Sequence, residues 1–454
     1  MSNACSYGAS SIHADEASKY AVGRHGGMLL VMVPRVRLAC VLATIALAAS
    51  GCGVRGSQPV AAAPATAHAT PSLVGPPPGL IPETWTGIHN FQVFDTRISP
   101  SQATQDAYRY DLVWGTNQPA AWKAGNPAIV TMFYGPFDAD FTRTNKIGWW
   151  LSHHADWILY RCDEKTPAWP GGLHNVPLDI SNPLVVQWQM QTYAPVMESE
   201  GDDGLAADLV GLSNDSGGCG VFVNGVWPPR FTGQKDDDAW AQAVLKWMAA
   251  AATALHSQER PLALGINHVP ESRTFGDPEE MTLLNEIDFD DDESSFTNYG
   301  NNYVTSQQVA KILQYMSYLQ GLDKPFIVDD KWNTKTVDDQ QLGWSIATYL
   351  LGKDHFSTLF TDHQPGYGYE YWYPQYAAAV GSPCGPAIAD PIHKGVYTRM
   401  YDGSYVLVNA SATVSYTLTL PKPSYQSIFG GRVTSPVTIG PDTGDVLLTT
   451  HGCH

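Results

Sequence analysis

Short apolar runs alternate with segments of helical periodicity along residues 85–390. The apolar runs predict eight β-strands: TGIHNF, YDLVWG, AIVTMFY, GLAADLV, LALGIN, IDFDDDE, PFIVDD and FSTLFTD. Apolar residues at helical spacing predict helices between them, the clearest over 238–256, 305–322 and 337–351. Strands that alternate with helices form a parallel sheet, and eight such units fit a (β/α)8 TIM barrel better than a six-stranded doubly wound sheet.

The pattern departs from this alternation in two places. A ninth apolar run, ADWILYRCDEKTPAW, leads into a loop, and we interpret it as an excursion between the third and fourth strands. After Pro391 apolar and polar residues alternate with period two between Gly, Asn and Pro turns, which is typical of short antiparallel strands. The sequence therefore predicts an α/β protein: a barrel over 85–390 followed by a small antiparallel β-sandwich over 391–454.

The N-terminal region has the pattern of a bacterial lipoprotein signal. Arg35 and Arg37 precede an apolar run of 12 residues, which suits a signal peptide and is too short to cross a bilayer. The run ends in Ala-Ser-Gly-Cys, which resembles a lipobox, so we expect cleavage after residues 1–51 and a lipid on Cys52. A start at Met32 would give a signal of 20 residues, which is a normal length.

Residues 52–84 are rich in Ala and Pro and predict an extended tether. Together with the signal they indicate an extracytoplasmic lipoprotein at the bacterial cell surface, a plain secreted protein being the alternative. The whole chain of 454 residues has 26 basic and 44 acidic residues, a net charge of −18, which repels phosphate groups. We therefore expect no nucleic-acid partner, and membrane contact only through the lipid anchor.

Four cysteines remain once the signal is removed and Cys52 is lipidated. An even number is expected to pair in an oxidising compartment, and order and proximity favour Cys162 with Cys219 and Cys384 with Cys453, although four cysteines allow three pairings. No Cys or His spacing is typical of a zinc site. We expect neither a metal nor an organic cofactor.

Reactive side chains of a (β/α)8 barrel lie at the carboxyl ends of its strands. The predicted strands end, in chain order, in His89 and Asn90, Trp114, Tyr134, Asp208, Asn267 and His268, Glu293, Asp329 and Asp330, and Asp362 and His363. Aromatic residues make up 11% of the chain, a content typical of surfaces that stack on sugar rings.

Two of these carboxylates have matching positions. In GLAADLV, Asp208 shares a strand face with Ala206 and Val210, so it points into the barrel mouth while the leucines meet the helices. In IDFDDDE the alternation of apolar residues carries Glu293 to the corresponding end. Paired carboxylates suit glycosidic cleavage, because one acts ionised and the other as an acid. Taken singly, Asp208 could cap a strand, and residues 288–293 could be a solvated loop or a calcium site.

Five segments in this order also resemble a known family: HADWILYRCD, LDISNPLVVQW, GLAADLVGLSND, IDFDDDESSFTN and GVYTRMYDGSYVLVNAS. They are similar to the bacterial glycoside hydrolase-like family 15 and, more distantly, to the endo-α-1,4-polygalactosaminidases, over residues 85–450. The resemblance implies a barrel of the α-glycosidase type with Asp208 as nucleophile and Glu293 as acid/base. Its relatives often have Asn after the fourth-strand Asp, where this chain has Leu209, with Asn214 the next amide downstream.

The expected substrate is a poly- or oligosaccharide. Candidate sugar contacts, beside the catalytic pair, are His89, Trp114, Tyr134, Asp179, Asn214, Asn267, Trp332 and Asp362, with Trp169, Trp227 and Trp372 as further aromatic candidates for which packing is the alternative. We expect retention of configuration, which requires carboxyl groups about 5–5.5 Å apart, over inversion, which requires about 6.5–9.5 Å. The alternative function is a carbohydrate-binding lipoprotein without activity, either a solute receptor or a degenerate barrel.

Overall fold

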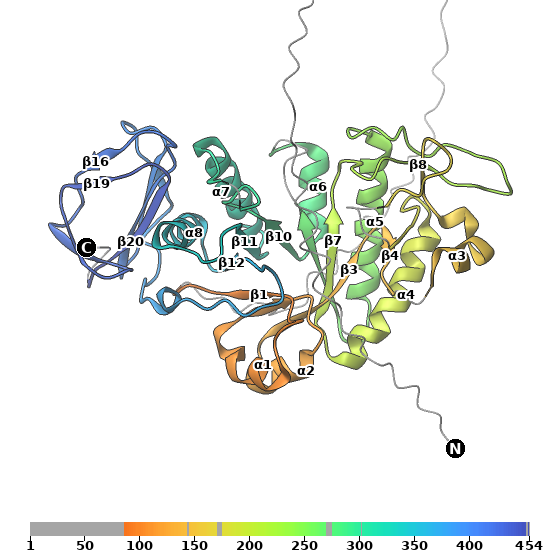
Figure 1. Cartoon of the computed structure of the whole chain (residues 1–454), viewed down its shortest axis with the longest axis horizontal. Helices are drawn as coiled ribbons and strands as arrows, with labels where there is room; N and C mark the ends of the chain where they lie inside the picture. The colour runs from red at the N-terminus through yellow and green to blue at the C-terminus, as the bar shows by residue number, and fades with distance from the viewer. Residues whose placement is uncertain are drawn as a thin grey trace, which may run out of the picture. The chain divides into compact units, whose positions relative to one another are not determined.

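The computed structural model describes residues 86–142, 145–169, 175–268, 275–300, 302–450 and 453 (Figure 1). The expected signal peptide, the lipid-bearing Cys52 and the tether over 52–84 lie outside these residues. In the part of the chain that is described, no helix is long and apolar enough to cross a membrane.

Eight parallel strands form the central sheet. In spatial order they are β1 (Phe91–Val93), β2 (Leu112–Trp114), β3 (Val130–Pro136), β7 (Gly204–Val210), β9 (Ala263–His268), β10 (Phe289–Glu293), β11 (Phe326–Trp332) and β12 (Ser357–His363). A bridge between Asn90 and Leu359 joins the two edges, and the Leu359 N–H donates to the His89 carbonyl over 2.8 Å. The prediction of a (β/α)8 barrel is confirmed, although β1 begins at Phe91, later than the first predicted run.

Helices follow most of the barrel strands and cover the sheet (Figure 1). Three were predicted: α5 (Asp238–His256), α7 (Ser306–Gln320) and α8 (Asp339–Gly352) are all confirmed. Each begins where a side chain satisfies the first free N–H groups, since α5 follows Asp237, and α7 and α8 start with capping boxes at Thr305 and Asp338. The others are α1 (Pro100–Asp106), α2 (Pro119–Gly125), α4 (Pro183–Glu200) and α6 (Pro278–Glu286).

The lower barrel interior is apolar. Alternate residues of the strands point inward and form one buried cluster, which includes Phe91, Leu112, Trp114, Met132, Ala206, Phe289, Ile327 and Phe360. Gly265 leaves room for two of these rings, because a Cβ there would lie 2.3 Å from a ring carbon of Phe289 and 2.9 Å from one of Trp114. The barrel is therefore a packed core, and ligands can enter only at its ends.

The segment between β3 and β7 forms the predicted excursion. It contains the helix α3 (Ile147–His153) and the short strands β4 (Ala139–Asp140), β5 (Tyr160–Arg161) and β6 (Val176–Pro177). β4 pairs with β6, and β5 pairs with β8 (Gly218–Gly220), which follows β7. The disulfide Cys162–Cys219 joins the excursion to the loop after β7. This pairing was predicted and is confirmed.

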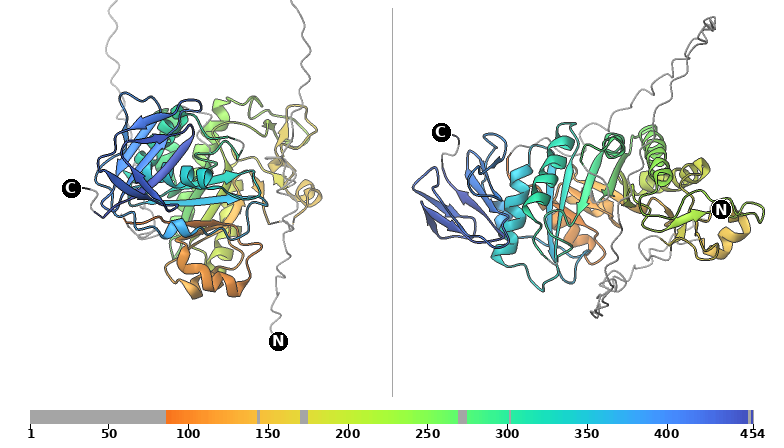
Figure 2. Two further views of the ribbon diagram at one scale, coloured as in Figure 1. Left: turned by 60° about the vertical axis from the view of Figure 1, so that its left-hand side comes forward. Right: turned by 90° about the horizontal axis from the view of Figure 1, so that it is seen from above.

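The C-terminal region contains two antiparallel sheets, which lie beside α8 (Figure 2). The larger is ordered β13 (Ile388–Ala389), β14 (Val396–Met400), β15 (Ser404–Asn409), β20 (Thr443–Leu448), β17 (Ser424–Ser427) and β18 (Arg432–Thr434). The smaller pairs β16 (Tyr416–Leu418) with β19 (Val437–Ile439), and residues of both sheets share one apolar core. The prediction of a β-sandwich is confirmed, and its first strand precedes Pro391.

Helix α8 connects the barrel to the β-sandwich. Ten successive residues of α8, 342–351, are buried because one face packs on the barrel strands and the other on β20. The contact is closest at two glycines, where a Cβ on Gly343 would lie 2.5 Å from the carbonyl oxygen of Gly444. The second predicted disulfide, Cys384–Cys453, is also confirmed, and it attaches the chain end beside β13.

Candidate active site

Polar side chains replace the apolar ones at the carboxyl end of the barrel. The inward face that carries Ala206 in β7 and Phe289 in β10 continues, two and four residues later, to Asp208 and Glu293. The same alternation brings four other polar side chains to this end from neighbouring strands: Tyr134, Asn267, Asp329 and Asp362. The structure thus gathers the residues on which the sequence-based hypothesis depends.

Asp208 accepts two hydrogen bonds. The Tyr134 hydroxyl donates to Asp208 Oδ2, and the Leu209 N–H donates to Oδ1 over 2.8 Å. Burial raises the pKa of Asp208 to about 6, with a further contribution from the negative charge of Glu293, while the two hydrogen bonds act in the opposite direction. At pH 7 Asp208 is therefore mostly ionised.

The backbone beside Asp208 is strained. Leu209 has a φ of 62°, a left-handed conformation that costs a residue such as Leu energy, and the register of β7 with β9 shifts between Ala207 and Val210. The shift falls at Asp208 and Leu209, and β7 pairs with β9 again at Val210, opposite His268. The position at which the resemblance led us to expect Asn is thus one where Asn would be favoured by the backbone. Such outliers concentrate at functional sites.

Glu293 is held from two sides. Asn267 Nδ2 donates to Glu293 Oε2 over 3.2 Å, and the Tyr367 hydroxyl lies 2.9 Å from Glu293 Oε1 and 2.7 Å from Asp329 Oδ2. A phenol has one proton, so Tyr367 donates to only one of these carboxyl groups at a time. Tyr367 was not predicted. It lies in the loop after β12, where no periodicity marks it.

Three neighbouring carboxyl groups have raised pKa values. Burial, and then repulsion by Asp362 and Glu293, raises the pKa of Asp329, and burial with the charge of Asp329 does the same for Asp291. Burial raises the pKa of Asp362 to about 8, although Lys331 lowers it. Asp362 therefore carries a proton for most of the time at neutral pH, and can donate a hydrogen bond to a bound molecule.

Aromatic rings lie next to both candidate catalytic groups. The ring of Phe94 is 5.0 Å from that of Tyr134 and 6.0 Å from that of Tyr367, and Phe141 lies 5.3 Å from Tyr134. The Lys331 ammonium is 4.4 Å from the centroid of the Tyr367 ring. Apolar ring faces next to hydrogen-bonding groups match the two sides of a sugar ring.

Two predicted contacts lie in other parts of the barrel. His89 precedes β1, and its Nδ1 lies 2.8 Å from Asp111 Oδ2, just before β2, so His89 is at the amino end of the barrel. Its prediction was wrong because the first strand starts later than its apolar run. Trp114 does point inward, but it is fully buried against Phe289 in the lower core.

Two predicted contacts instead hold loops in place. Asn214 donates to the Gly218 carbonyl over 2.8 Å and accepts from the Gly218 N–H over 2.9 Å, so its amide shapes the turn after β7. Asp179 is buried, accepts from the N–H and hydroxyl of Ser181, and lies 3.5 Å from Arg230. Neither joins the cluster around Asp208 and Glu293 through a described interaction.

Other candidates point outward into the helix layer. Trp332 is buried and donates to Ser345 of α8 over 3.3 Å, and Asp330 accepts from the Phe296 N–H over 2.8 Å. His268 is fully buried, 3.2 Å from Glu280 of α6. These side chains serve packing, which corrects the expectation that Trp332 lines a subsite. Trp227 packs on Phe222, which also follows β7, and on Tyr160 of the excursion. Trp372 packs on Tyr110 and Arg109.

Asp138, like Tyr367, was missed by the sequence analysis. It follows β3 by two residues, is buried, and its pKa is raised to about 8 by burial and by the charge of Asp208. A carboxyl group directly after the apolar Phe137, two residues past the end of β3, was a signal that could have identified it.

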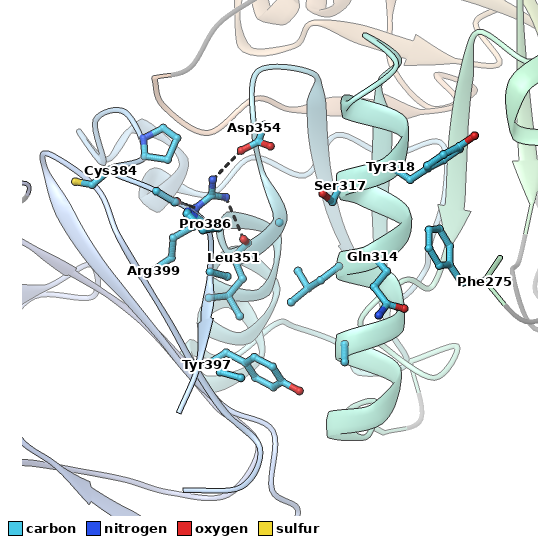
Figure 3. A pocket seen from close by; sticks show the side chains of 17 residues that line it. Phe275, Gln314, Ser317, Tyr318, Leu351, Asp354, Cys384, Pro386, Tyr397 and Arg399 are labelled. Carbon is cyan, nitrogen blue, oxygen red and sulfur yellow. Dashed lines mark hydrogen bonds and ion pairs between the residues drawn. The ribbon is translucent and has the colours of Figure 1, made fainter. Parts of the chain in front are cut away.

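A cavity of about 890 Å³ lies away from the barrel mouth, between α7 and the start of the β-sandwich (Figure 3). The only carboxylate among its described lining residues is Asp354, which accepts from Arg399 over 2.7 Å. The guanidinium also donates to backbone carbonyls, including those of Leu351 and Lys353. Because this carboxylate is committed to an ion pair, the cavity lacks the paired acid and base of the barrel mouth. The described part of the chain also contains no group of three or more His, Cys, Asp or Glu placed to hold a metal ion.

Three solved structures are among those similar to this chain. A maltogenic α-amylase from Thermotoga neapolitana aligns with 12% identity over 80% of this chain and 97% of its own, with a TM-score of 0.46. The glycoside hydrolase domain of PelA from Pseudomonas aeruginosa aligns with 15% identity over 63% and 97%, with a TM-score of 0.39. A GH36 α-galactosidase from Geobacillus stearothermophilus aligns with 11% identity over 80% and 56%, with a TM-score of 0.43. No curated protein matches the sequence.

The barrel with carboxylates at the carboxyl ends of its strands is of the glycoside hydrolase class. The sequence model described as hypothetical glycosyl hydrolase family 15 matches residues 123–404, which is more than half of the chain. The chain belongs to this family and is a glycoside hydrolase. The expected resemblance to the family is confirmed, whereas the more distant resemblance to polygalactosaminidases stays a prediction.

Proposed function

We propose that the protein hydrolyses a poly- or oligosaccharide with Asp208 as nucleophile and Glu293 as acid/base. The observation that carries the proposal is the pairing of these carboxyl groups at the ends of β7 and β10, where each is bound by a tyrosine hydroxyl and the two interact electrostatically. Asp208 accepts two hydrogen bonds and is mostly ionised at neutral pH, which suits a nucleophile.

The proposed reaction has two steps, and Asp208 and Glu293 supply the reacting groups of the protein in both. In the first, the Glu293 proton moves to the glycosidic oxygen, the bond from that oxygen to the anomeric carbon breaks towards the oxygen, and Asp208 forms an ester with the carbon. In the second, the Glu293 carboxylate takes a proton from water, the water oxygen bonds to the anomeric carbon, and the ester bond breaks to restore the Asp208 carboxylate. This order retains the configuration at the anomeric carbon.

Substitution of each carboxyl group tests the roles. Asp208→Asn should abolish turnover of all substrates. Glu293→Gln should lower kcat/KM by about 10²–10⁴ for sugar leaving groups and much less for glycosyl fluorides, since kcat/KM reports the first step and fluoride departs without protonation. Asp323→Asn is the matched control, because this carboxylate is 80% exposed and follows α7 at the other end of the barrel. Full turnover by Asp208→Asn would contradict the assignment.

Two further measurements separate this function from its alternatives. Proton NMR during the first minutes of hydrolysis should show that the released sugar has the same anomeric configuration as the substrate. The opposite configuration would show that the enzyme inverts and does not retain. Sugar binding that survives in both variants, with no turnover by the unaltered protein on a polysaccharide panel, would favour a receptor.

The extracytoplasmic location is a proposal that rests on the sequence alone. The Arg-rich head, the apolar run and the Ala-Ser-Gly-Cys motif before the tether support lipidation of Cys52. In a bacterial host, the protein should incorporate radiolabelled palmitate and fractionate with membranes. Cys52→Ser should lose the label, and an unlabelled protein released by the cell would favour plain secretion.

A further inference from the structure

The loop after β12 fixes the position of Tyr367 at the barrel mouth. The Gly368 N–H donates to the Val93 carbonyl of β1 over 3.0 Å. Gln92 Nε2, also of β1, donates to the Tyr369 carbonyl over 2.8 Å. The two residues that follow Tyr367 are therefore bound to β1, and the backbone holds the phenol in a defined place.

The Tyr367 hydroxyl lies between two carboxyl groups. Glu293 Oε1 is 2.9 Å from it and Asp329 Oδ2 is 2.7 Å from it, and both distances are those of a hydrogen bond. Burial, with the negative charges of Asp329 and Glu293, raises the pKa of Tyr367 well above its usual range, so the phenol keeps its proton. If both carboxyl groups were ionised, one carboxylate oxygen would face the phenol oxygen with no proton between them. One of the two carboxyl groups must therefore be protonated.

Asp329 is the better place for that proton. Its side chain is buried, and its Oδ1 has no hydrogen-bond partner among the described residues. An ionised carboxyl group in this position is costly, because a buried charged oxygen would lack a donor. Burial, and then repulsion by Asp362 and Glu293, also raises the pKa of Asp329. Glu293, in contrast, has a second donor in Asn267 Nδ2, which is 3.2 Å from Oε2.

These contacts form a hydrogen-bond chain with one direction. We propose that protonated Asp329 donates to the Tyr367 oxygen and that Tyr367, as a positioning residue, donates to Glu293. The inference rests on the proposed hydrolase function, and it adds that Asp329 acts as a neutral acid and not as a carboxylate.

The chain stabilises the charge that the first step produces. Glu293 gives its proton to the glycosidic oxygen and becomes a carboxylate, while Tyr367 and Asp329 keep their protons. The hydrogen bond from Tyr367 then changes from a neutral one to a charge-assisted one, which is about twice as strong. Because the donor is already in place, this stabilisation requires no rearrangement during the reaction.

The experiment separates a reaction that puts charge on Glu293 from one that does not. Trisaccharides of glucose, galactose and mannose, α- and β-linked, are paired with the glycosyl fluorides of the same sugars, since fluoride departs without protonation. In Tyr367→Phe, the ratio of kcat/KM for the trisaccharide to kcat/KM for the fluoride should fall about five- to tenfold. This is the difference between a hydrogen bond to a charged group and one to a neutral group.

Tyr371→Phe is the matched control for the loop. It loses the same hydroxyl four residues further on, where that hydroxyl donates to the His363 carbonyl over 2.7 Å and contacts neither carboxyl group through a described interaction. Its ratio should stay at the unaltered value. In a Glu293→Gln background no charge develops, so Tyr367→Phe should lower kcat/KM for the trisaccharide no further.

The protonation of Asp329 is measured directly. In protein with carbon-13-labelled aspartate, the carboxyl signal that disappears in Asp329→Asn should have the chemical shift of a neutral acid at the pH of the assay. In that variant the amide Nδ2 replaces the donor, so the ratio should stay within about twofold of the unaltered value.

Three outcomes would overturn the inference and leave the hydrolase function intact. They are an ionised Asp329 in the unaltered protein, equal falls on trisaccharide and fluoride in Tyr367→Phe, and a further fall caused by Tyr367→Phe in the Glu293→Gln background. Absence of turnover by the unaltered protein on every pair and on the polysaccharide panel would reject the function, and the inference with it.

Discussion

Tyr134→Phe should change the pH at which the enzyme becomes active. The substitution removes only the hydroxyl that donates to Asp208 Oδ2. Burial and the charge of Glu293 raise the pKa of Asp208 to about 6, and the Tyr134 hydrogen bond acts against this rise because it favours the ionised form. Without the hydroxyl the pKa of Asp208 must increase further.

The size of this change follows from the strength of the lost hydrogen bond. A hydrogen bond to a charged group contributes about 1.5–3 kcal/mol, and one pKa unit corresponds to about 1.4 kcal/mol. The pKa of Asp208 should therefore rise by about one to two units, to about 7–8. Since Asp208 must be ionised to attack, kcat/KM at pH 6 should fall about 5- to 50-fold from this cause, and the fall should shrink as the pH rises towards 9.

The assay is the pH profile of kcat/KM on a glycosyl fluoride, with a direct titration of Asp208 by carbon-13 NMR. Tyr367→Phe is the control, because its hydroxyl contacts Glu293 and Asp329 and not Asp208. Glu293→Gln should act in the opposite direction, since it removes a negative charge that raises the pKa of Asp208. An acidic limb in Tyr134→Phe at the same pH as in the unaltered enzyme would refute the reasoning.

Four further predictions concern stability. Leu209→Asn should raise the Tm and Leu209→Val should lower it, because Asn tolerates the φ of 62° and a β-branched residue does not. The same Tm in both variants and in the unaltered protein would contradict the backbone strain at Leu209. Gly343→Ala should cost about 1–3 kcal/mol of unfolding free energy, since its Cβ would lie 2.5 Å from a β20 carbonyl, whereas Gly148→Ala has open space and should cost nothing. Burial raises the pKa of Asp202 to about 8, so the folded state keeps a proton there and loses stability as the pH rises from about 4 through 8. In Asp202→Asn, urea unfolding should show this loss reduced by about 1–3 kcal/mol, and an unchanged pH dependence would argue against the raised pKa. Deletion of 391–454 should give insoluble protein because it uncovers α8, and a soluble, active barrel would contradict this.

The elements that the sequence predicted best are those with a regular period. Eight apolar runs with helical segments between them led to the barrel, and α5 begins and ends at the residues that its helical spacing predicted. The alternation of strand faces also predicted that Asp208 and Glu293 point inward. These features depend on neighbours within a few residues.

The errors arose where strand limits or distant partners decided the outcome. His89 lies before β1 because pairing with β2 starts only at Phe91, which the apolar run does not reveal. Trp332 and Asn214 were judged by residue type, but the packing of α8 and a turn of the β7 loop determine what these side chains contact.

The sequence alone was enough to predict a barrel with two inward-pointing carboxylates, at the ends of the fourth and sixth strands. It was enough because the side chains of a strand point alternately to its two faces, which is a local rule. Only the tertiary structure decided which side chains form hydrogen bonds with these two carboxylates. Tyr134 contacts Asp208 across 74 residues of chain, and Tyr367 contacts Glu293 across another 74. No local period encodes such contacts, since they form only when the barrel closes and brings the strand ends together. The same closure buries the carboxyl groups side by side, and burial and mutual repulsion then set their pKa values.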